Sequence, residues 1–351
     1  MTAAGRVRRQ HPEEPIALIR HRTFADAALE PPRDASSLVM RAVRRGLSVL
    51  AAGLLVAPAT AADFTLASDQ QAIGEVGHYT THSQDTLLDL ARSDDLGFTQ
   101  FMAANRGIDP WLPGAGRLVT LPDFYLLPDA PRDGIVINLA EQRLYYFPPG
   151  GGRIETYPIG VGVERRSTPI GTTSVIRKEA NPTWYPPPSI HAEDPDLPAA
   201  MPPGPDNPLG AFALHLGWSG YLIHGTDKPD GVGRNVSHGC LHLYPEDIER
   251  LFREVPVGTH VRVISQEVKV AWVSDGLYVQ VHPSKSQAEE IDVTGSFAPK
   301  MPPDLAARVT SAVAHRAVQV DWGVVRRAGI ERTGLPVRIA GAPAEGNVAA
   351  R

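Results

Sequence analysis

The sequence predicts a mainly β protein, with a small α/β unit before the main β region and a hairpin followed by a helix after it. The chain has 32 glycines and 33 prolines among 351 residues, so turns should be frequent and long helices few. Between residues 134 and 281, short segments alternate apolar and polar residues, as half-buried strands do. Hydrophobic residues make up 42% of the chain and charged residues 21%, which is typical of a globular protein rather than a disordered or membrane one.

A secretory signal peptide is predicted over residues 40–62. From Met40 the sequence reads MRAVRRGLSVLAAGLLVAPATAADF, with a basic start, an apolar run and small residues before a cleavage site after Ala61 or Ala62. The alternative is a buried or membrane helix, but the apolar run is too short to span a bilayer. Residues 1–39 show no clear pattern and are interpreted as a non-native upstream extension. We therefore expect an exported protein with no membrane span after processing.

The first predicted domain covers residues 77–123 and has the order strand, helix, helix, strand. Its expected elements are a strand around Tyr79, a helix through Leu87, Leu88 and Ala91 capped by Asp85, a helix over 98–105 and a strand over 118–121. Both helices are short, which predicts a small α/β unit.

The rest of the chain is predicted as a β domain over residues 134–266 and a C-terminal region over 267–351. The expected elements are two strands joined by a turn at 140–142, further strands within 153–162 and 172–180, proline-rich loops at 186–188 and 202–208, a strand within 259–265, a hairpin with its turn at 274–276, and a helical tail over 303–328. No internal repeat is visible, so one continuous β domain is the simplest interpretation.

Cys240 is the only cysteine in the chain, and its neighbours indicate chemistry. Exported proteins often pair cysteines as disulfides, which a single cysteine cannot do within one chain. His224 lies 16 positions earlier, before a glycine-rich loop that can fold back and bring an imidazole beside the thiol. A free thiol has a pKa of about 8.5, and a nearby imidazole can take its proton and hold the ion pair. Gly239 permits a turn whose N–H groups can point at an oxyanion, so these residues together indicate acyl transfer.

The same residues allow two other interpretations. On a strand, His238, Cys240 and His242 would project from one face, and with His224 they would form a tetrahedral zinc site. Ligands at two-residue spacing are cramped, and Gly239 is a poor strand residue, which counts against zinc. In the plainest interpretation, the cysteine is an inert residue among core or surface histidines.

The segment around Cys240 resembles the signature of the YkuD-type L,D-transpeptidases, in which an HG pair precedes SHGC by a loop. It reads YLIHGTDKPDGVGRNVSHGCLHLYPEDIERLF. Two earlier segments, STPIGTTSVIRKEANPTWYPPPSI and NPLGAFALHL, are similar to other shared parts of this family, and the resemblance covers residues 134–265. The hairpin EVKVAWVSDGLYVQVHP resembles the segment C-terminal to the catalytic domain in the Gram-negative periplasmic branch. The α/β unit resembles a LysM domain, which grips glycan strands, although a packing module without sugar affinity would look the same.

The resemblance implies a fold, a substrate and a set of site residues. The fold is a catalytic β-sandwich of two mixed sheets, and the substrate is the peptidoglycan stem peptide. Cys240 would attack the carbonyl between diaminopimelate and D-alanine, and His224 would take the thiol proton. The other implied residues are His238, Gly239, Ser237 and Gly225 for the oxyanion site and for positioning, and His242, Tyr221 and Trp218 for substrate binding.

This chain departs from the family pattern at His242, where many members carry arginine and some carry asparagine. Arginine binds carboxylates bidentately, whereas histidine is shorter and mostly neutral at pH 7. Substrate affinity or acceptor choice is therefore in question at this position, more than the chemistry itself.

The resemblance implies no cofactor and no metal. The expected partners are stem peptides, glycan strands and, as one acceptor, a lysine of an outer-membrane lipoprotein; other acceptors are a second diaminopimelate, giving a 3→3 cross-link, and water, giving L,D-carboxypeptidase activity. A net charge of −5 argues against nucleic acid. Two other functions stay open, a cysteine endopeptidase of stem peptides and a wall-binding protein with weakened catalysis. The periplasm is the expected location.

Overall fold

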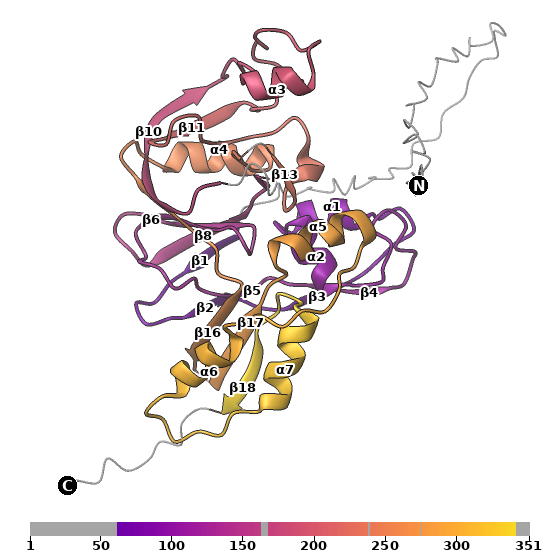
Figure 1. Cartoon of the computed structure of the whole chain (residues 1–351), viewed down its shortest axis with the longest axis vertical. Helices are drawn as coiled ribbons and strands as arrows, with labels where there is room; N and C mark the ends of the chain where they lie inside the picture. The colour runs from indigo at the N-terminus through magenta and orange to yellow at the C-terminus, as the bar shows by residue number, and fades with distance from the viewer. Residues whose placement is uncertain (1–61, 163–167, 238, 275, 342–351) are drawn as a thin grey trace, which may run out of the picture. The chain divides into compact units, whose positions relative to one another are not determined.

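The computed structural model describes residues 62–162, 168–237, 239–274 and 276–341 (Figure 1). The predicted upstream extension and signal peptide lie outside these residues, apart from Ala62, which begins the first strand. The prediction of a mainly β fold is confirmed, because strands dominate and the helices are short. Within the described ranges, no helix combines the length and the apolar character needed to cross a membrane.

A curled mixed sheet of nine strands holds most of the β structure, in the order β1-β8-β7-β6-β15-β10-β11-β12-β14 (Figure 1). In chain order its strands are β1 (Ala62–Thr65), β6 (Gly134–Asn138), β7 (Arg143–Phe147), β8 (Arg153–Pro158), β10 (Gly171–Ala180), β11 (Phe212–Leu216), β12 (Leu222–His224), β14 (Leu241–His242) and β15 (His260–Ile264). Most neighbours are antiparallel, but β6 with β15 and β12 with β14 are parallel. Beside this sheet, β9 (Val161–Gly162) pairs in parallel with β13 (Asn235–Ser237).

Strand β10 belongs to both halves of the large sheet. Its residues 171–174 pair with β15, whereas residues 175–180 pair with β11. The pairing with β11 has a register irregularity between Val175 and Arg177. The expected two sheets of a sandwich are therefore one continuous sheet whose halves share a strand. Both halves supply buried side chains to the same core, as Ile135 and Val263 do from one half and Leu214 and Leu241 from the other. Helix α4 (Pro245–Glu254) adds Ile248 and Leu251 to this core.

The small α/β unit has the predicted order of strand, helix, helix and strand. Its elements are β3 (Gly77–Thr80), α1 (Leu87–Ser93), α2 (Phe98–Ala104) and β4 (Leu118–Leu121), and β3 pairs antiparallel with β4. We call residues 77–121 the βααβ module. Its identity as a LysM domain stays a prediction.

The N-cap of α1 differs from the predicted one. The hydroxyl of Thr86 accepts the Asp89 N–H at 3.0 Å, which makes Thr86 the cap. Asp85 instead accepts the N–H of His82 at 2.6 Å and closes the preceding turn. Threonine and aspartate are both good caps, so the sequence alone could not choose between adjacent positions.

Helix α5 (Lys285–Thr294) completes the core of the βααβ module although it lies far along the chain. Ile291 of α5 and the nearby Phe297 are buried in the same cluster as Leu87, Phe101 and Met102. Figure 1 shows α5 beside α1 and α2. The hydrophobic core of the module is therefore built from two distant segments of sequence.

The C-terminal region contains the predicted hairpin and a third strand that was not predicted. Its elements are β16 (Val268–Val273), β17 (Gly276–Val281), α6 (Leu305–Val313), α7 (Trp322–Glu331) and β18 (Val337–Gly341), and β18 pairs antiparallel with β17. The predicted helix over 303–328 is wrong in extent. Helix α6 ends at Val313, shortly before His315 takes a left-handed φ of 69°, and Asp321 caps the start of α7 by accepting the Val324 N–H.

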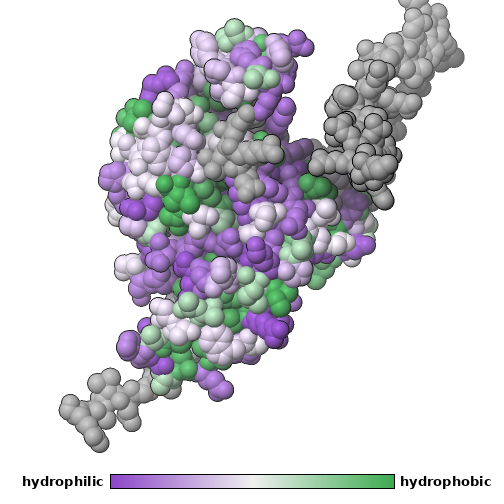
Figure 2. All heavy atoms as spheres, in the orientation of Figure 1, coloured by the Kyte–Doolittle hydropathy of each residue, from purple (hydrophilic) through white to green (hydrophobic). Residues whose placement is uncertain are grey.

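The remaining elements are short. They are β2 (Ala72–Gly74), which pairs antiparallel with β5 (Phe124–Leu126), α3 (Pro188–Glu193) and a 3₁₀ turn over Pro229–Gly231. Helix α3 begins at Pro188, the last residue of the first expected proline-rich loop, and lies between the two loops. Figure 2 shows small apolar patches separated by hydrophilic residues on the visible face.

Candidate active site

The strand register brings Cys240 and His224 to one face of the sheet. Cys240 directly precedes β14, which pairs in parallel with β12, the strand that ends at His224. In this register Ile223 lies opposite Leu241 and His224 lies opposite His242. Partners on neighbouring strands project to the same side, and alternate residues of a strand share a face. The side chains of His242 and His224 therefore project to the same side, and Cys240 lies at the start of β14, two residues before His242.

The His224 imidazole has its tautomer fixed by its neighbour. Its Nδ1 lies 2.6 Å from the carbonyl oxygen of Gly225. A carbonyl can only accept, so Nδ1 carries the proton and Nε2 is left as a proton acceptor. The side chain is buried, with 7% of its surface exposed. Burial, followed by the nearby His242, lowers the pKa of His224 to about 3, so the ring is a neutral base near pH 7.

The thiol is also neutral at rest. Burial raises the pKa of Cys240 above its usual value, although a hydrogen bond from the backbone of Leu222 opposes the rise. The sulfur lies 3.6 Å from the carbonyl oxygen of Gly220, which is a suitable acceptor for a thiol proton. Burial disfavours the charged forms of both groups, which argues against the expected resting thiolate–imidazolium pair.

A glycine turn leads into the nucleophile and is held by two hydroxyl groups. Gly239 has a φ of +107°, a backbone conformation that residues other than glycine rarely adopt. Thr168 donates its hydroxyl proton to the Gly239 carbonyl at 2.8 Å. Ser237 donates to the carbonyl of Cys240 and accepts the Gly239 N–H at 3.2 Å. The predicted positioning role of Ser237 thus has a geometric basis, and Thr168 is a further residue that the sequence reasoning did not single out.

The hydrogen bond to Ser237 narrows the choice of oxyanion donor. It occupies the N–H of Gly239, which had been expected to shape the oxyanion site. The N–H of Cys240 has no hydrogen-bond acceptor among the described residues. His238, the other expected contributor, lies outside the described residues. The Cys240 N–H is therefore the donor that this turn leaves available.

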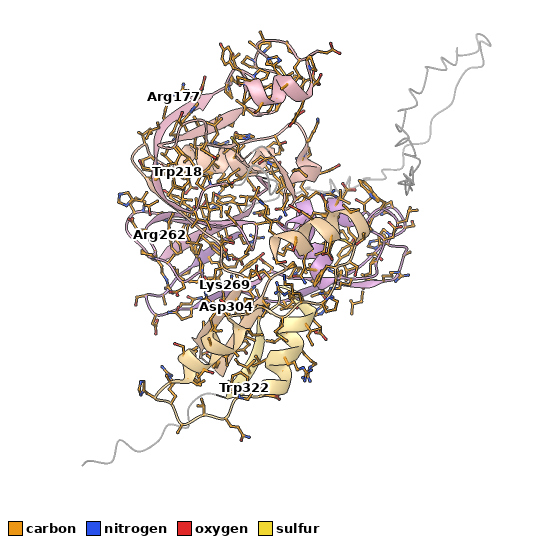
Figure 3. The ribbon with its side chains drawn as sticks, viewed as in Figure 1. Arg177, Trp218, Arg262, Lys269, Asp304 and Trp322 are labelled. Carbon is orange, nitrogen blue, oxygen red and sulfur yellow. The ribbon has the colours of Figure 1, made fainter. Side chains whose placement is uncertain are left out.

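Trp218 and Tyr221 flank the turn that approaches the thiol. Their rings meet edge to face, with centroids 6.2 Å apart, and both pack against the main core. Between them lies Gly220, whose carbonyl faces the sulfur. Trp218 also covers Gly171 of β10, since a Cβ there would lie 3.4 Å from the indole, and it is labelled in Figure 3. Both aromatics thus flank the residue whose carbonyl faces the thiol, and their role in substrate binding stays a prediction.

His242 lies in the interior, with only 6% of its side chain surface exposed. Gly160 bridges to its backbone in both directions, and a Cβ on Gly160 would come within 2.0 Å of the imidazole. Burial lowers the pKa of His242, opposed by a hydrogen bond to the backbone of Gly231. Its ring stands 6.2 Å from the ring of His224. The structure therefore places His242 beside the base, and not on an open surface where it would meet substrate.

Gly225 supports the base from behind. A Cβ at this position would lie 3.0 Å from the Cγ2 atom of Ile248 on α4 and 3.4 Å from Gly210. The absence of a side chain lets the core close over the carbonyl that holds His224. This contact explains why glycine comes directly after the histidine.

A metal interpretation finds no support in the described part of the chain. No group of three or more histidine, cysteine, aspartate or glutamate side chains there is arranged to hold a metal ion. Cys240, His242 and His224 share a face, but both imidazoles are engaged with backbone groups. His238, the fourth candidate zinc ligand, lies outside these residues.

Comparisons with known proteins agree with the resemblance in the sequence. The YkuD family, described as the L,D-transpeptidase catalytic domain, matches residues 132–263. "Probable L,D-transpeptidase YbiS" of Escherichia coli K12 is 42% identical over 250 residues, covering 70% of this chain and 80% of that protein. "Probable L,D-transpeptidase YcfS" of the same strain is 39% identical over 273 residues, covering 75% and 82%. A crystal structure of an Enterococcus faecium L,D-transpeptidase aligns at 25% identity over 38% of this chain and 49% of that one, with a TM-score of 0.31.

The fold and these relatives define the class of the protein as a cysteine-containing, mainly β transferase. The chain belongs to the YkuD-type L,D-transpeptidases of the Gram-negative kind.

Proposed function

We propose that this L,D-transpeptidase acts on peptidoglycan stem peptides, with Cys240 as the nucleophile and His224 as the general base. The observation that supports this assignment most directly is the state of the imidazole. Its Nδ1 is committed to the Gly225 carbonyl, so its Nε2 can accept a proton on the face that Cys240 shares. A neutral thiol beside a neutral base is a starting state from which one proton transfer generates the nucleophile.

In the acylation step, Cys240 attacks the carbonyl carbon between diaminopimelate and D-alanine. The thiol proton passes to Nε2 of His224 as the carbon–sulfur bond forms. The Cys240 N–H, with His238 as the further expected contributor, stabilises the negative oxygen of the tetrahedral intermediate. The carbon–nitrogen bond then breaks, and the imidazolium returns its proton to the departing D-alanine amine. The products are a thioester on Cys240 and free D-alanine.

In the second step, an amine attacks the thioester carbonyl. His224 takes a proton from the attacking nitrogen, the carbon–sulfur bond breaks, and the same proton restores the thiol. An acceptor diaminopimelate gives a 3→3 cross-link and a lipoprotein lysine gives an attached lipoprotein. Water in place of the amine gives the trimmed tripeptide. Trp218 and Tyr221 flank Gly220, whose carbonyl faces the thiol, and would contact the stem peptide next to the bond that is cut.

The remaining parts of the chain are assigned supporting roles in the same proposal. Residues 134–266 form the catalytic domain and residues 267–351 the C-terminal region. The LysM-like domain, residues 77–123, would hold glycan strands of the wall. Cleavage of the signal peptide over residues 40–62 would deliver the mature enzyme to the periplasm.

The test is incubation of purified protein with disaccharide-tetrapeptide, followed by mass analysis of protein and products. We expect an adduct on Cys240 that has lost one D-alanine, and cross-linked dimers of the 3→3 type. Tripeptide without dimer would identify an L,D-carboxypeptidase, and cuts elsewhere in the stem would identify an endopeptidase. Binding to wall sacculi with no adduct and no product would mean that the chain is a binding protein, which would overturn the proposal.

A further inference from the structure

The segment that links His224 to Cys240 is held from outside the catalytic sheet. Helix α2 of the βααβ module directs its first free N–H groups at this segment: Phe98 donates to the carbonyl of Val232 at 3.3 Å, and Thr99 donates to that of Gly233 at 3.0 Å. The helix has a glycine at its N-cap, with no side-chain cap of its own. Carbonyls of the linking segment therefore satisfy the donors that a capping side chain normally satisfies.

The backbones meet at a pair of glycines. A Cβ on Gly233 would come within 2.3 Å of the Cα of Gly97, and a Cβ on Gly97 within 2.9 Å of the Cα of Gly233. Gly233 also has a φ of +77°, which disfavours any larger residue. The module and the linking segment are thus in direct backbone contact, with no side chain between them.

Arg234 comes next in the chain and contacts an aromatic ring and a carboxylate. Its guanidinium carbon lies 3.6 Å from the centre of the Phe98 ring, within the range of a cation–π contact. Its terminal nitrogen lies 2.8 Å from a carboxylate oxygen of Asp292 on α5. Only 18% of the Arg234 side chain and 23% of the Asp292 side chain are exposed, so the pair is only partly screened by water. Phe98 and Ile291 of α5 share one buried cluster, so both partners of Arg234 belong to the same packed body.

Further hydrogen bonds hold the residues between Arg234 and the thiol. The Arg234 carbonyl accepts the Val161 N–H at 2.9 Å, and the Asn235 side chain accepts the amide of Gln142 at 2.9 Å. Two residues later, Ser237 bonds to the turn that carries Cys240. These bonds fix residues 234–237 against neighbouring elements, and the backbone joins Arg234 directly to the turn that carries Cys240, so a displacement at Arg234 can reach the nucleophile.

We propose that Arg234 is a positioning residue, through which the βααβ module and α5 fix the segment that presents Cys240 to His224. The module therefore takes part in catalysis, in addition to any hold on the wall. This inference rests on the proposed function of Cys240 and His224. It adds the requirement that Arg234 keep its contacts with the module and with α5 for acylation to proceed at the full rate.

The test uses the full chain with Arg234→Gln and Arg234→Lys, and disaccharide-tetrapeptide as the donor. We expect Arg234→Gln to slow formation of the Cys240 adduct on the order of 10- to 100-fold, as small misplacements of reacting groups do, with little change in KM. The lysine variant keeps the charge and should recover most of the rate. Reaction with iodoacetamide should change in the opposite direction in Arg234→Gln: a loosened segment relieves the burial of the thiol, so alkylation at a fixed pH becomes faster and its pH midpoint falls.

The matched control is Arg92→Gln, which breaks another ion pair between the module and the catalytic domain. Arg92 binds Glu246 of α4 through two bonds of 2.8 Å. It lines the same cavity as Pro229 and Val232 of the linking segment but is hydrogen-bonded to neither. This variant should acylate at the wild-type rate. If Arg234→Gln does not fold, Asp292→Asn removes the same ion pair with less disturbance. Normal acylation and an unchanged alkylation profile in Arg234→Gln or Asp292→Asn would overturn the inference, as would an equal loss in Arg92→Gln. An adduct that still forms in Cys240→Ala would instead overturn the proposed function.

Discussion

Two polar clusters in this chain show that a neighbouring opposite charge, more than burial, determines whether an enclosed side chain is charged or neutral. In the catalytic cluster, His224 is buried and Cys240 is partly buried, no opposite charge lies beside them, and both are neutral. The second cluster, which we call the paired cluster, joins the catalytic sheet to the C-terminal hairpin. There the Lys269 ammonium lies 2.6 Å from Glu141, which also accepts a 2.6 Å bond from Tyr145 (Figure 3 labels Lys269).

The carboxyl of Glu141 shows the difference most clearly. Burial by itself would raise its pKa, but the charge of Lys269, followed by that of His282, lowers the pKa to about 2. His224 is as fully enclosed and lacks such a partner, and its pKa is lowered to about 3, towards the neutral form. Paired charges lock two parts of the fold together. An unpaired neutral thiol keeps a proton to give and an unpaired neutral imidazole keeps a nitrogen to accept it, which is what a nucleophile and its base require.

The largest expected effect comes from breaking the catalytic cluster. Cys240→Ala should abolish the thioacyl adduct, and His224→Gln should cost several orders of magnitude in turnover, because nucleophile and base act as one unit. The double variant should be little worse than either single one. Mass analysis of the adduct and product assays measure both effects.

The matched control for His224→Gln is His260→Gln. His260 is an exposed histidine on β15 whose contact is with Asp133, far from the thiol in the sheet order. It should keep full activity. Transpeptidase activity that survives Cys240→Ala would remove the thiol from the mechanism.

The next largest effect comes from breaking the paired cluster. Lys269→Met leaves the Glu141 carboxylate buried without its ammonium partner, which should cost about 3–5 kcal/mol of unfolding free energy. The double variant Lys269→Met, Glu141→Gln removes both charges and should recover part of this loss. Urea denaturation of the three proteins at pH 7 measures it. Equal stability of the single variant and the wild type would show that the ion pair is not what holds the two parts together.

Acid titration of stability sharpens the comparison. The folded pKa of His224, about 3, is below its ordinary value of 6.5, so between these values the unfolded chain binds a proton that the folded one refuses. The contribution of His224 to the free energy of unfolding is therefore fully present above about pH 6.5 and is lost as the pH falls towards 3. The loss is on the order of 2 kcal/mol between pH 7 and 5. His224→Gln should flatten this part of the curve. Parallel curves for the variant and the wild type would contradict the burial of a neutral imidazole.

The smallest effect concerns the thiol. Because burial raises the pKa of Cys240, iodoacetamide should react near pH 7 more slowly than with a free thiol of pKa about 8.5, and the rate should climb at alkaline pH. His224→Gln should change this profile little while abolishing turnover, since the imidazole is neutral at rest. Fast alkylation at pH 6 that disappears in His224→Gln would mean that a resting ion pair exists after all.

Local elements of the fold could be predicted from the sequence, and long-range ones could not. Strand β4 and helix α2 begin at the predicted residues because local apolar patterns and turn residues mark them. Strand β18 was missed because its partner β17 lies some 60 residues earlier in the sequence, and the alternation in residues 337–341 is short. The predicted tail helix failed where β-branched residues and a left-handed His315 interrupt an apolar pattern.

The candidate site shows the same division. Cys240 and His224 could be named from their motif, since residue type and spacing carry that information. The burial of His242 could not, because Gly160, which covers its ring, is 82 positions away in the sequence. The neutral state of the thiol was also out of reach, because it depends on how completely the sheet and its turns exclude water.

Helix α5 affects the order in which this chain can fold. The βααβ module is synthesised long before residues 285–297, yet Ile291 and Phe297 complete its core. Until they arrive, the apolar side chains of α1 and α2 lack part of their cover and are open to chaperones, proteases and self-association. The contact also spans nearly 200 residues, which slows the search for the native state. A fragment ending after β4 should therefore be less stable than its compact appearance suggests, and a domain graft that moves this module to another protein would have to carry α5 with it.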